Sequence, residues 1–153
     1  MGQSTNAILF WGYTWVDEET SKPWEIGNES EDGETDDEDD DWEARYAATQ
    51  GLREPVNADY THPKWRDYWN EKRRLSAESG CLIDTHCSGD CPMPYVAIRT
   101  SHAVALRGDP NDLADDHMTV KPEWREQIDN FCRVMGIPIP QTAPRWYLVS
   151  DWN

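Results

Sequence analysis

A run of acidic residues near the N-terminus limits where this chain can build a folded core. Fifteen Asp and Glu residues and a single lysine lie between Asp17 and Glu43, so this segment carries −14 of the net charge of −16. Like charges repel one another within a screening length of about 8–10 Å. We therefore expect a mobile acidic insertion at about residues 17–41 within a single domain that spans residues 1–153.

The remaining sequence has the composition of one folded domain. The chain has 153 residues, with nine Trp and six Tyr, and each buried aromatic ring removes on the order of 150–250 Å² from water. The apolar run Ala7–Trp11 is too short to cross a membrane and lacks the basic flank of a secretory signal. We therefore expect a cytoplasmic protein without a membrane partner, whose four cysteines are thiols.

The N-terminal half predicts one strand and two helices. Ala7–Tyr13 is rich in β-forming residues and should form a central strand. Asp41 can cap a helix over Trp42–Gln50, which Gly51 ends. A second helix is expected over Pro63–Glu78, because proline is favoured in the first helical turn and aromatic residues recur on one face.

The C-terminal half predicts three strands and one helix. We expect strands over Cys81–Cys87, Tyr95–Arg107 and Trp146–Val149, and a helix over Pro122–Met135. For Tyr95–Arg107, one long strand with a bend or bulge is favoured over two strands. The order β-α-α-β-β-α-β predicts an α+β fold, in which three helices cover a mainly antiparallel sheet of about four to five strands.

A cluster of Cys and His residues could hold zinc. Thiolates and imidazoles are zinc ligands, and four of them complete a tetrahedral site; the candidates are Cys81, His86, Cys87 and Cys91. A continuous strand would place Cys81 about 20 Å from Cys87, whereas two sulfurs on one zinc lie at most about 4.6 Å apart. Zinc therefore requires a broken strand. Buried or half-buried thiols are the favoured alternative, with no cofactor.

A catalytic pair is the enzymatic interpretation of the same region. Cys87 would be the nucleophile and His102 the general base. In a regular strand, His102 would share a face with Val96 and Ile98, so a hydrogen-bonded core histidine is the alternative. The sequence has no phosphate-binding loop, dinucleotide glycine motif, zinc-protease helix or nucleophile elbow. We therefore expect a protein that is not an enzyme.

The second helix carries a basic patch, for which two interpretations remain. Its basic residues could dock the acidic segment of the same chain or bind a phosphate-bearing ligand; the candidates are Lys64, Lys72, Arg73 and Arg74. Alternatively, they form a solvated face with ion pairs that each contribute little to stability. The net charge of −16 argues against direct DNA binding outside this patch.

The acidic run itself also has two interpretations. It can be a solvated, disordered segment, or it can bind a partner by presenting carboxylates to a basic groove, as nucleic-acid phosphates do. Extended residues repeat every ~3.3 Å, which resembles the phosphate spacing along a single nucleic-acid strand. The candidate partner-binding residues are Asp36, Asp37, Glu38, Asp39, Asp40 and Asp41.

A set of short sequence strings is spread over most of the chain: Met1-Gly2-Gln3-Ser4-Thr5, Ala7-Ile8-Leu9, Gly12, Thr85-His86-Cys87-Ser88, Pro92-Met93, Tyr95-Val96-Ala97, Arg107-Gly108, Trp124, Trp146, Leu148, Ser150 and Trp152. Together these strings resemble a family of small uncharacterised bacteriophage proteins. The acidic segment lies outside the resemblance, and similar sequences have an aromatic residue in place of Cys91. No catalytic residue can be carried over from this family.

The resemblance implies a viral protein in the cytoplasm of an infected bacterium. Together with the segregated charge, it favours an accessory protein that binds a host or phage protein and inhibits a nucleic-acid-dependent host factor through the acidic segment. Two alternatives stay open. One is a small ligand-binding, catalytic or zinc protein that uses the Cys and His residues, and the other is a minor virion component.

Overall fold

The first strand is the centre of the sheet. In this computed structural model, which describes residues 5–27 and 41–152, β1 (Thr5–Thr14) pairs antiparallel with β5 (Arg145–Trp152) over eight residues. Along its other side, β1 pairs with β4 (Ala103–Ala105) and then with β3 (Cys91–Ile98), both antiparallel. A strand rich in aromatic and branched residues fits this central position, because both of its faces are covered.

The remaining strand, β2 (Cys81–Ser88), closes the sheet into a ring. It pairs antiparallel with β3 along its whole length, and its final residues Cys87 and Ser88 pair in parallel with Asp151 and Trp152 of β5. Because β3 also pairs with β1, strands β1, β3, β2 and β5 form a closed ring, to which β4 adds an edge. In the described part of the chain the fold is therefore α+β, with a mostly antiparallel five-stranded sheet, as predicted.

The two faces of the sheet hold two separate apolar clusters. Neighbouring residues of a strand point to opposite faces. Within the ring, Ile8 and Phe10 pack with Tyr95 and Ala97. On the outer face, Trp11, Tyr13, Val96 and Ile98 pack against α3 (Trp124–Met135) through Trp124, Ile128 and Phe131.

Gly12 is required where β1 and β3 meet. A Cβ atom at this position would lie 1.9 Å from the carbonyl oxygen of Val96. This is far inside van der Waals contact, so only glycine lets the two backbones pair at Ala97. The close approach explains why a glycine interrupts an otherwise bulky strand.

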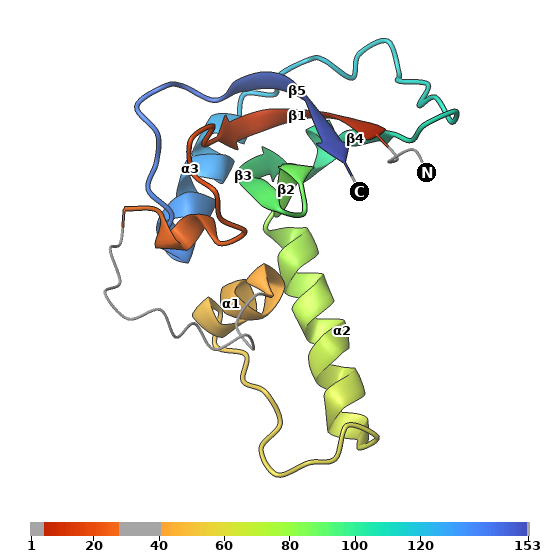
Figure 1. The fold of residues 1–153 in the computed structure, drawn as a ribbon. Coiled ribbons are helices and arrows are strands. Elements are labelled where there is room, and N and C mark those ends of the chain that lie inside the picture. The colour runs from red at the N-terminus through yellow and green to blue at the C-terminus, as the bar shows by residue number, and fades with distance from the viewer. Residues whose placement is uncertain (1–4, 28–40, 153) are drawn as a thin grey trace.

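The other two helices form an arm that extends from the sheet. Figure 1 shows α2 (Pro63–Glu78) projecting away from the strands, with α1 (Trp42–Thr49) beside it. The first helix contacts both α2 and α3, and its hydrophobic contacts with Phe131 come from Trp42 and Tyr46. A short 3₁₀ turn, η1 (Pro23–Glu25), adds the buried ring of Trp24 to the α3 side of the core.

The long strand expected over Tyr95–Arg107 is divided in two. A 3₁₀ turn, η3 (Arg99–Ser101), separates β3 from β4. The hydroxyl of Ser101 accepts a hydrogen bond from the backbone nitrogen of Trp11 at 2.9 Å and donates one to the carbonyl of Ile98 at 2.6 Å. The Ser101 side chain thus supplies the hydrogen bond to β1 that a strand backbone would otherwise make. The chain can therefore turn here while β3 and β4 both still pair with β1.

Candidate binding groove between α1 and α2

A groove of about 850 Å³ lies between the two helices of the arm. Its α1 wall presents the small side chains of Ala44 and Ala48, and its α2 wall presents the rings of Trp65, Tyr68 and Trp69. The small residues leave space in front of the large ones. This volume lies in the range of about 300–1,000 Å³ that is typical of ligand pockets, and a groove of this kind can also hold a segment of another protein.

The aromatic wall is fixed around Trp65. The indole nitrogen of Trp65 donates a hydrogen bond to the carbonyl of Ala58 at 3.1 Å, and its ring lies 4.8 Å from Tyr60 and 5.7 Å from both Tyr68 and Trp69, centroid to centroid. Trp65 and Tyr68 are buried, whereas Trp69 is 40 % exposed and Tyr60 72 % exposed. The wall therefore has a rigid base and two accessible rings.

An ion pair between the two helices lies in the lining of the groove. Lys72 on α2 pairs with Asp41, which also caps α1 by accepting a hydrogen bond from the backbone nitrogen of Glu43 at 3.0 Å. The Lys72 ammonium lies 5.9 Å from the centre of the Tyr68 ring. Arg45, also on the lining, donates to the carbonyl of Met135. The side chains of Asp41, Lys72 and Arg45 are thus engaged within the protein.

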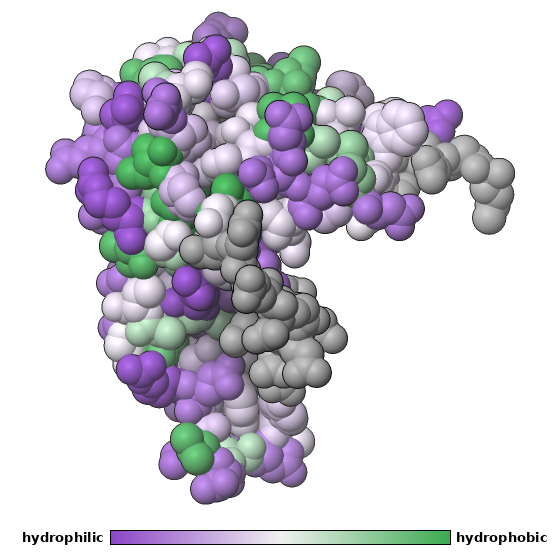
Figure 2. Space-filling model, turned by 60° about the vertical axis from the view of Figure 1, so that its left-hand side comes forward, coloured by the Kyte–Doolittle hydropathy of each residue, from purple (hydrophilic) through white to green (hydrophobic). Residues whose placement is uncertain are grey.

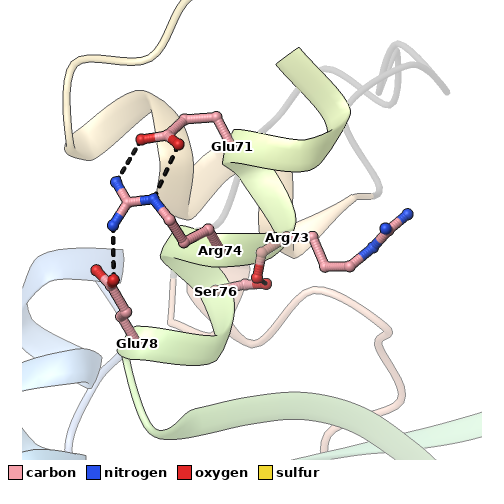
Figure 3. A network of polar contacts seen from close by, with 5 residues as sticks. All are labelled: Glu71, Arg73, Arg74, Ser76 and Glu78. Atoms are coloured by element: carbon pink, nitrogen blue, oxygen red, sulfur yellow. Dashed lines mark hydrogen bonds and ion pairs between the residues drawn. The ribbon is translucent and has the colours of Figure 1, made fainter. Parts of the chain in front are cut away.

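The basic residues predicted on α2 do not form one cluster. Arg74 forms ion pairs with Glu71 and Glu78, and Figure 3 shows the Arg73 side chain pointing away from this network. The hydrogen bond from Arg74 holds the pKa of Glu71 below its usual range. Lys64 is exposed in the first turn of α2, more than two helical turns from Lys72. Within the described residues, Lys72 contacts the end of the acidic segment, through Asp41.

The proposed partner-binding carboxylates are only partly within the described structure. Asp36, Asp37, Glu38, Asp39 and Asp40 lie outside the described residues. Asp41, the last of the series, lines the groove as well as capping α1. Residues 28–40 contain nine acidic and no basic residues, and they are joined directly to this position.

The candidate zinc ligands lie in three places. Cys81 is buried at the start of β2, and the strand runs without a break to Ser88. Cys87 and Cys91 lie at the hairpin between β2 and β3, while His86 contacts β1. Within residues 5–27 and 41–152, no group of three or more His, Cys, Asp or Glu residues is arranged to hold a metal ion.

The two histidines of the sequence hypotheses instead lie beside Tyr95 inside the ring. His102 Nε2 is 2.9 Å from the Tyr95 hydroxyl oxygen, and His86 Nε2 is 3.2 Å from Thr14 Oγ1. The prediction that His102 shares a face with Ile98 is wrong. The η3 turn interrupts the alternation of side chains between the two faces, and the His102 ring stacks on Tyr95 instead. Sequence reasoning missed Tyr95 and Thr14 as partners, since neither residue type in a strand signals a polar cluster.

Burial keeps both imidazoles neutral near pH 7. It lowers the pKa of His86, against the opposing effect of Asp151. It also lowers the pKa of His102, which Asp84 opposes and Arg99 reinforces. Burial, followed by the charges of Asp84 and Asp151, raises the pKa of Tyr95. The cluster is therefore a neutral hydrogen-bonded group near the two carboxylates.

The described residues form a small α+β protein, and its helical arm contains the groove. Comparison with protein-family models, curated proteins and solved structures found no significant match. Among the helices of the described residues, none has the length and apolar character needed to span a membrane. The face of the molecule in Figure 2 is mainly hydrophilic, with separate hydrophobic patches.

Proposed function

We propose that this protein is a non-enzymatic binding protein, which holds a basic segment of a partner protein in the groove between α1 and α2. The observation that carries the proposal is the position of Asp41. This residue lines a groove with an aromatic wall and is joined directly to a stretch of nine carboxylates. Aromatic anchoring and acidic attraction therefore meet at one place.

The aromatic wall supports an interface with a protein chain. Trp and Tyr are enriched among the residues that dominate binding energy at interfaces, and the exposed rings of Trp69 and Tyr60 are available for contact. Their supporting neighbour Trp65 is held by Ala58, so little side-chain freedom has to be lost on binding. Rings of this kind also attract Arg and Lys side chains through cation–π interactions.

The acidic segment supports a basic partner. Residues 28–40 contain nine acidic residues and lead directly into Asp41 on the groove lining. Of the three basic residues of the lining, Lys72 pairs with Asp41, Arg45 is hydrogen-bonded to the carbonyl of Met135, and the third is Arg53. A local excess of one charge speeds encounter with a partner of opposite charge and discriminates against acidic ones. Direct binding of DNA is disfavoured by the same charge.

The resemblance to small bacteriophage proteins supports a setting in the cytoplasm of an infected bacterium. In that setting the partner is a host or phage protein, and a basic nucleic-acid-binding surface is the natural complement of the acidic segment. Occupying such a surface would inhibit a nucleic-acid-dependent host factor. A minor virion component is the competing role, and purification of phage particles tests it: the protein should be absent from them.

A labelled peptide tests the binding chemistry directly. We expect an Arg-rich peptide with one Trp to bind the full chain, and a matched peptide with Glu in place of Arg to bind at least about tenfold more weakly. Trp69→Ala should weaken binding of the Arg-rich peptide by about tenfold. Replacing Asp36–Asp40 by their amides should weaken it and reduce its salt dependence. Fluorescence anisotropy measures each affinity.

Leu148→Ala is the matched surface control. Leu148 is 74 % exposed on β5 and does not line the groove, so its removal should leave the affinity unchanged. Unchanged binding by both Trp69→Ala and the amide variant would refute the proposal. Affinity capture from infected cells is a second test. The wild type and Leu148→Ala should both recover a basic protein, and Trp69→Ala should not.

A further inference from the structure

Two cysteines meet at the tip of the hairpin between β2 and β3. The strands are joined through Gly89 and Asp90, so that Ser88 pairs with Cys91, and Cys87 pairs with Pro92 on the next rung. The backbone nitrogen of Cys91 donates to Ser88 Oγ at 3.2 Å. Cysteines on adjacent rungs of a hairpin have Cα atoms within the span that a disulfide can bridge.

The two thiols are already neighbours. The carboxylate of Glu19 and, to a smaller extent, the thiol of Cys87 raise the pKa of the Cys91 thiol, as groups close to it do. Cys87 has a φ of 82°, a left-handed value that is rare for a residue other than glycine. In a regular hairpin, side chains on adjacent rungs lie on opposite faces. Cys87 and Cys91 depart from this rule, and the left-handed backbone of Cys87 lies at the point of departure.

The other two cysteines are in different surroundings. Cys81 and Cys132 are fully buried, and burial raises the pKa of each thiol to about 12. Cys87 and Cys91 are each partly exposed. A small oxidant can therefore reach the hairpin pair while the core pair is shielded.

We propose that Cys87 and Cys91 form a reversible intramolecular disulfide when the protein meets a small disulfide oxidant such as oxidised glutathione. The Cys87 thiolate attacks one glutathione sulfur, which forms a mixed disulfide and releases one glutathione thiolate. The Cys91 sulfur then attacks Cys87, which closes the protein disulfide and releases the second glutathione. The two protons lost by the cysteines are taken up by the two released thiolates, so two thiols of the protein are oxidised and one oxidant disulfide is reduced.

Glu19 orders the two steps. Its carboxylate is the largest cause of the raised pKa of the Cys91 thiol, followed by burial. Because the thiolate of Cys91 is disfavoured, we assign Cys91 to the second step, the attack on the mixed disulfide. The closed disulfide has no S–H group, so oxidation changes the interaction between Cys91 and Glu19. Glu19 lies in the linker between β1 and η1, which makes this linker the segment that responds to the redox state.

Thiol counting by mass spectrometry tests the proposal. Reduced protein should alkylate at all four cysteines after denaturation. After treatment with oxidised glutathione it should alkylate at two, and peptide mapping should find Cys87 linked to Cys91. Dithiothreitol should restore all four. Stable glutathione adducts at Cys87 or Cys91 without a link, or no reaction at either residue, would overturn the proposal.

Single variants separate the steps. Cys91→Ser should stop the reaction at a glutathione adduct on Cys87, while Cys132→Ser should leave formation of the disulfide unchanged. Glu19→Gln should speed closure of the mixed disulfide at neutral pH, because the Cys91 thiol would ionise more readily. Circular dichroism of each variant verifies the fold. Closure at the same rate in Glu19→Gln and wild type would reject the assigned role of Glu19.

Discussion

The hydroxyl of Tyr95 lies 2.9 Å from Nε2 of His102, and this contact joins β3 to the residue that leads into β4. Tyr95 is fully buried and its ring stacks on Phe10 with centroids 4.2 Å apart. A polar bond thus lies inside the smaller apolar cluster, where an unpaired donor or acceptor is costly. The two sides of the η3 turn are therefore held together by side chains.

Tyr95→Phe should destabilise the protein by about 1–3 kcal/mol, because it leaves the His102 nitrogen without its partner in a buried site. Urea denaturation measures the free energy of unfolding. Tyr147→Phe is the matched control, since Tyr147 also stacks on Phe10 but is only half-buried. An equal loss in both variants would show that the Tyr95–His102 bond contributes nothing specific.

Stability should fall in mild acid because of His86 and His102. Both imidazoles have a folded-state pKa below their unfolded value, so the unfolded chain binds more protons at low pH. This contribution is complete above an unfolded pKa of about 6.5 and is lost as the pH falls through the folded values. Asp84 and Asp151 oppose the shifts, whereas Arg99 reinforces that of His102.

Urea denaturation at a series of pH values between neutrality and mild acid measures this effect. His102→Gln should flatten the decline in the free energy of unfolding. His62→Gln is the control, because His62 is an exposed residue at the start of α2. A decline that is the same in His102→Gln as in the wild type would assign the acid sensitivity to other groups.

The sequence predicted the elements whose signals are local. Pro63 marks the first residue of α2, and Gly136 adopts a φ of 71° at the end of α3. Both effects depend on backbone geometry within one turn. The sequence also predicted the strands that begin near Ala7 and Trp146. Each is longer in the structure than predicted, because β1 and β5 pair with each other over eight residues.

Contacts between distant parts of the chain could not be predicted in the same way. The closure of the ring depends on Ser88 meeting Trp152, and the η3 turn depends on Ser101 bonding to Trp11. The groove depends on small residues of α1 facing rings of α2, and the periodicity of one helix cannot show what faces it. The sequence predicts that the aromatic residues of α2 share one face, but it does not show that Trp69 on this face is 40 % exposed.

Asp41→Ala should destabilise the protein by about 1–2 kcal/mol, because it removes both the cap of α1 and the ion pair with Lys72. Asp41→Asn separates the two effects, since an asparagine still caps the helix but cannot pair with the lysine. It should cost no more than about 1 kcal/mol. Thermal or urea denaturation of both variants measures this difference, and equal losses would contradict a capping role.

Gly12→Ala should be the most damaging small substitution in the sheet. The new methyl group would lie 1.9 Å from the Val96 carbonyl oxygen, so β1 and β3 would have to separate at the point where the ring closes. Overpacking of this kind costs about 1–3 kcal/mol or more, and here the atom that must move is backbone. Gly89→Ala is the matched control, because no atom lies within 4 Å of a Cβ at that position. Urea denaturation should show a large loss for Gly12→Ala and little change for Gly89→Ala, and similar stability of the two variants would mean that β1 and β3 can separate without cost.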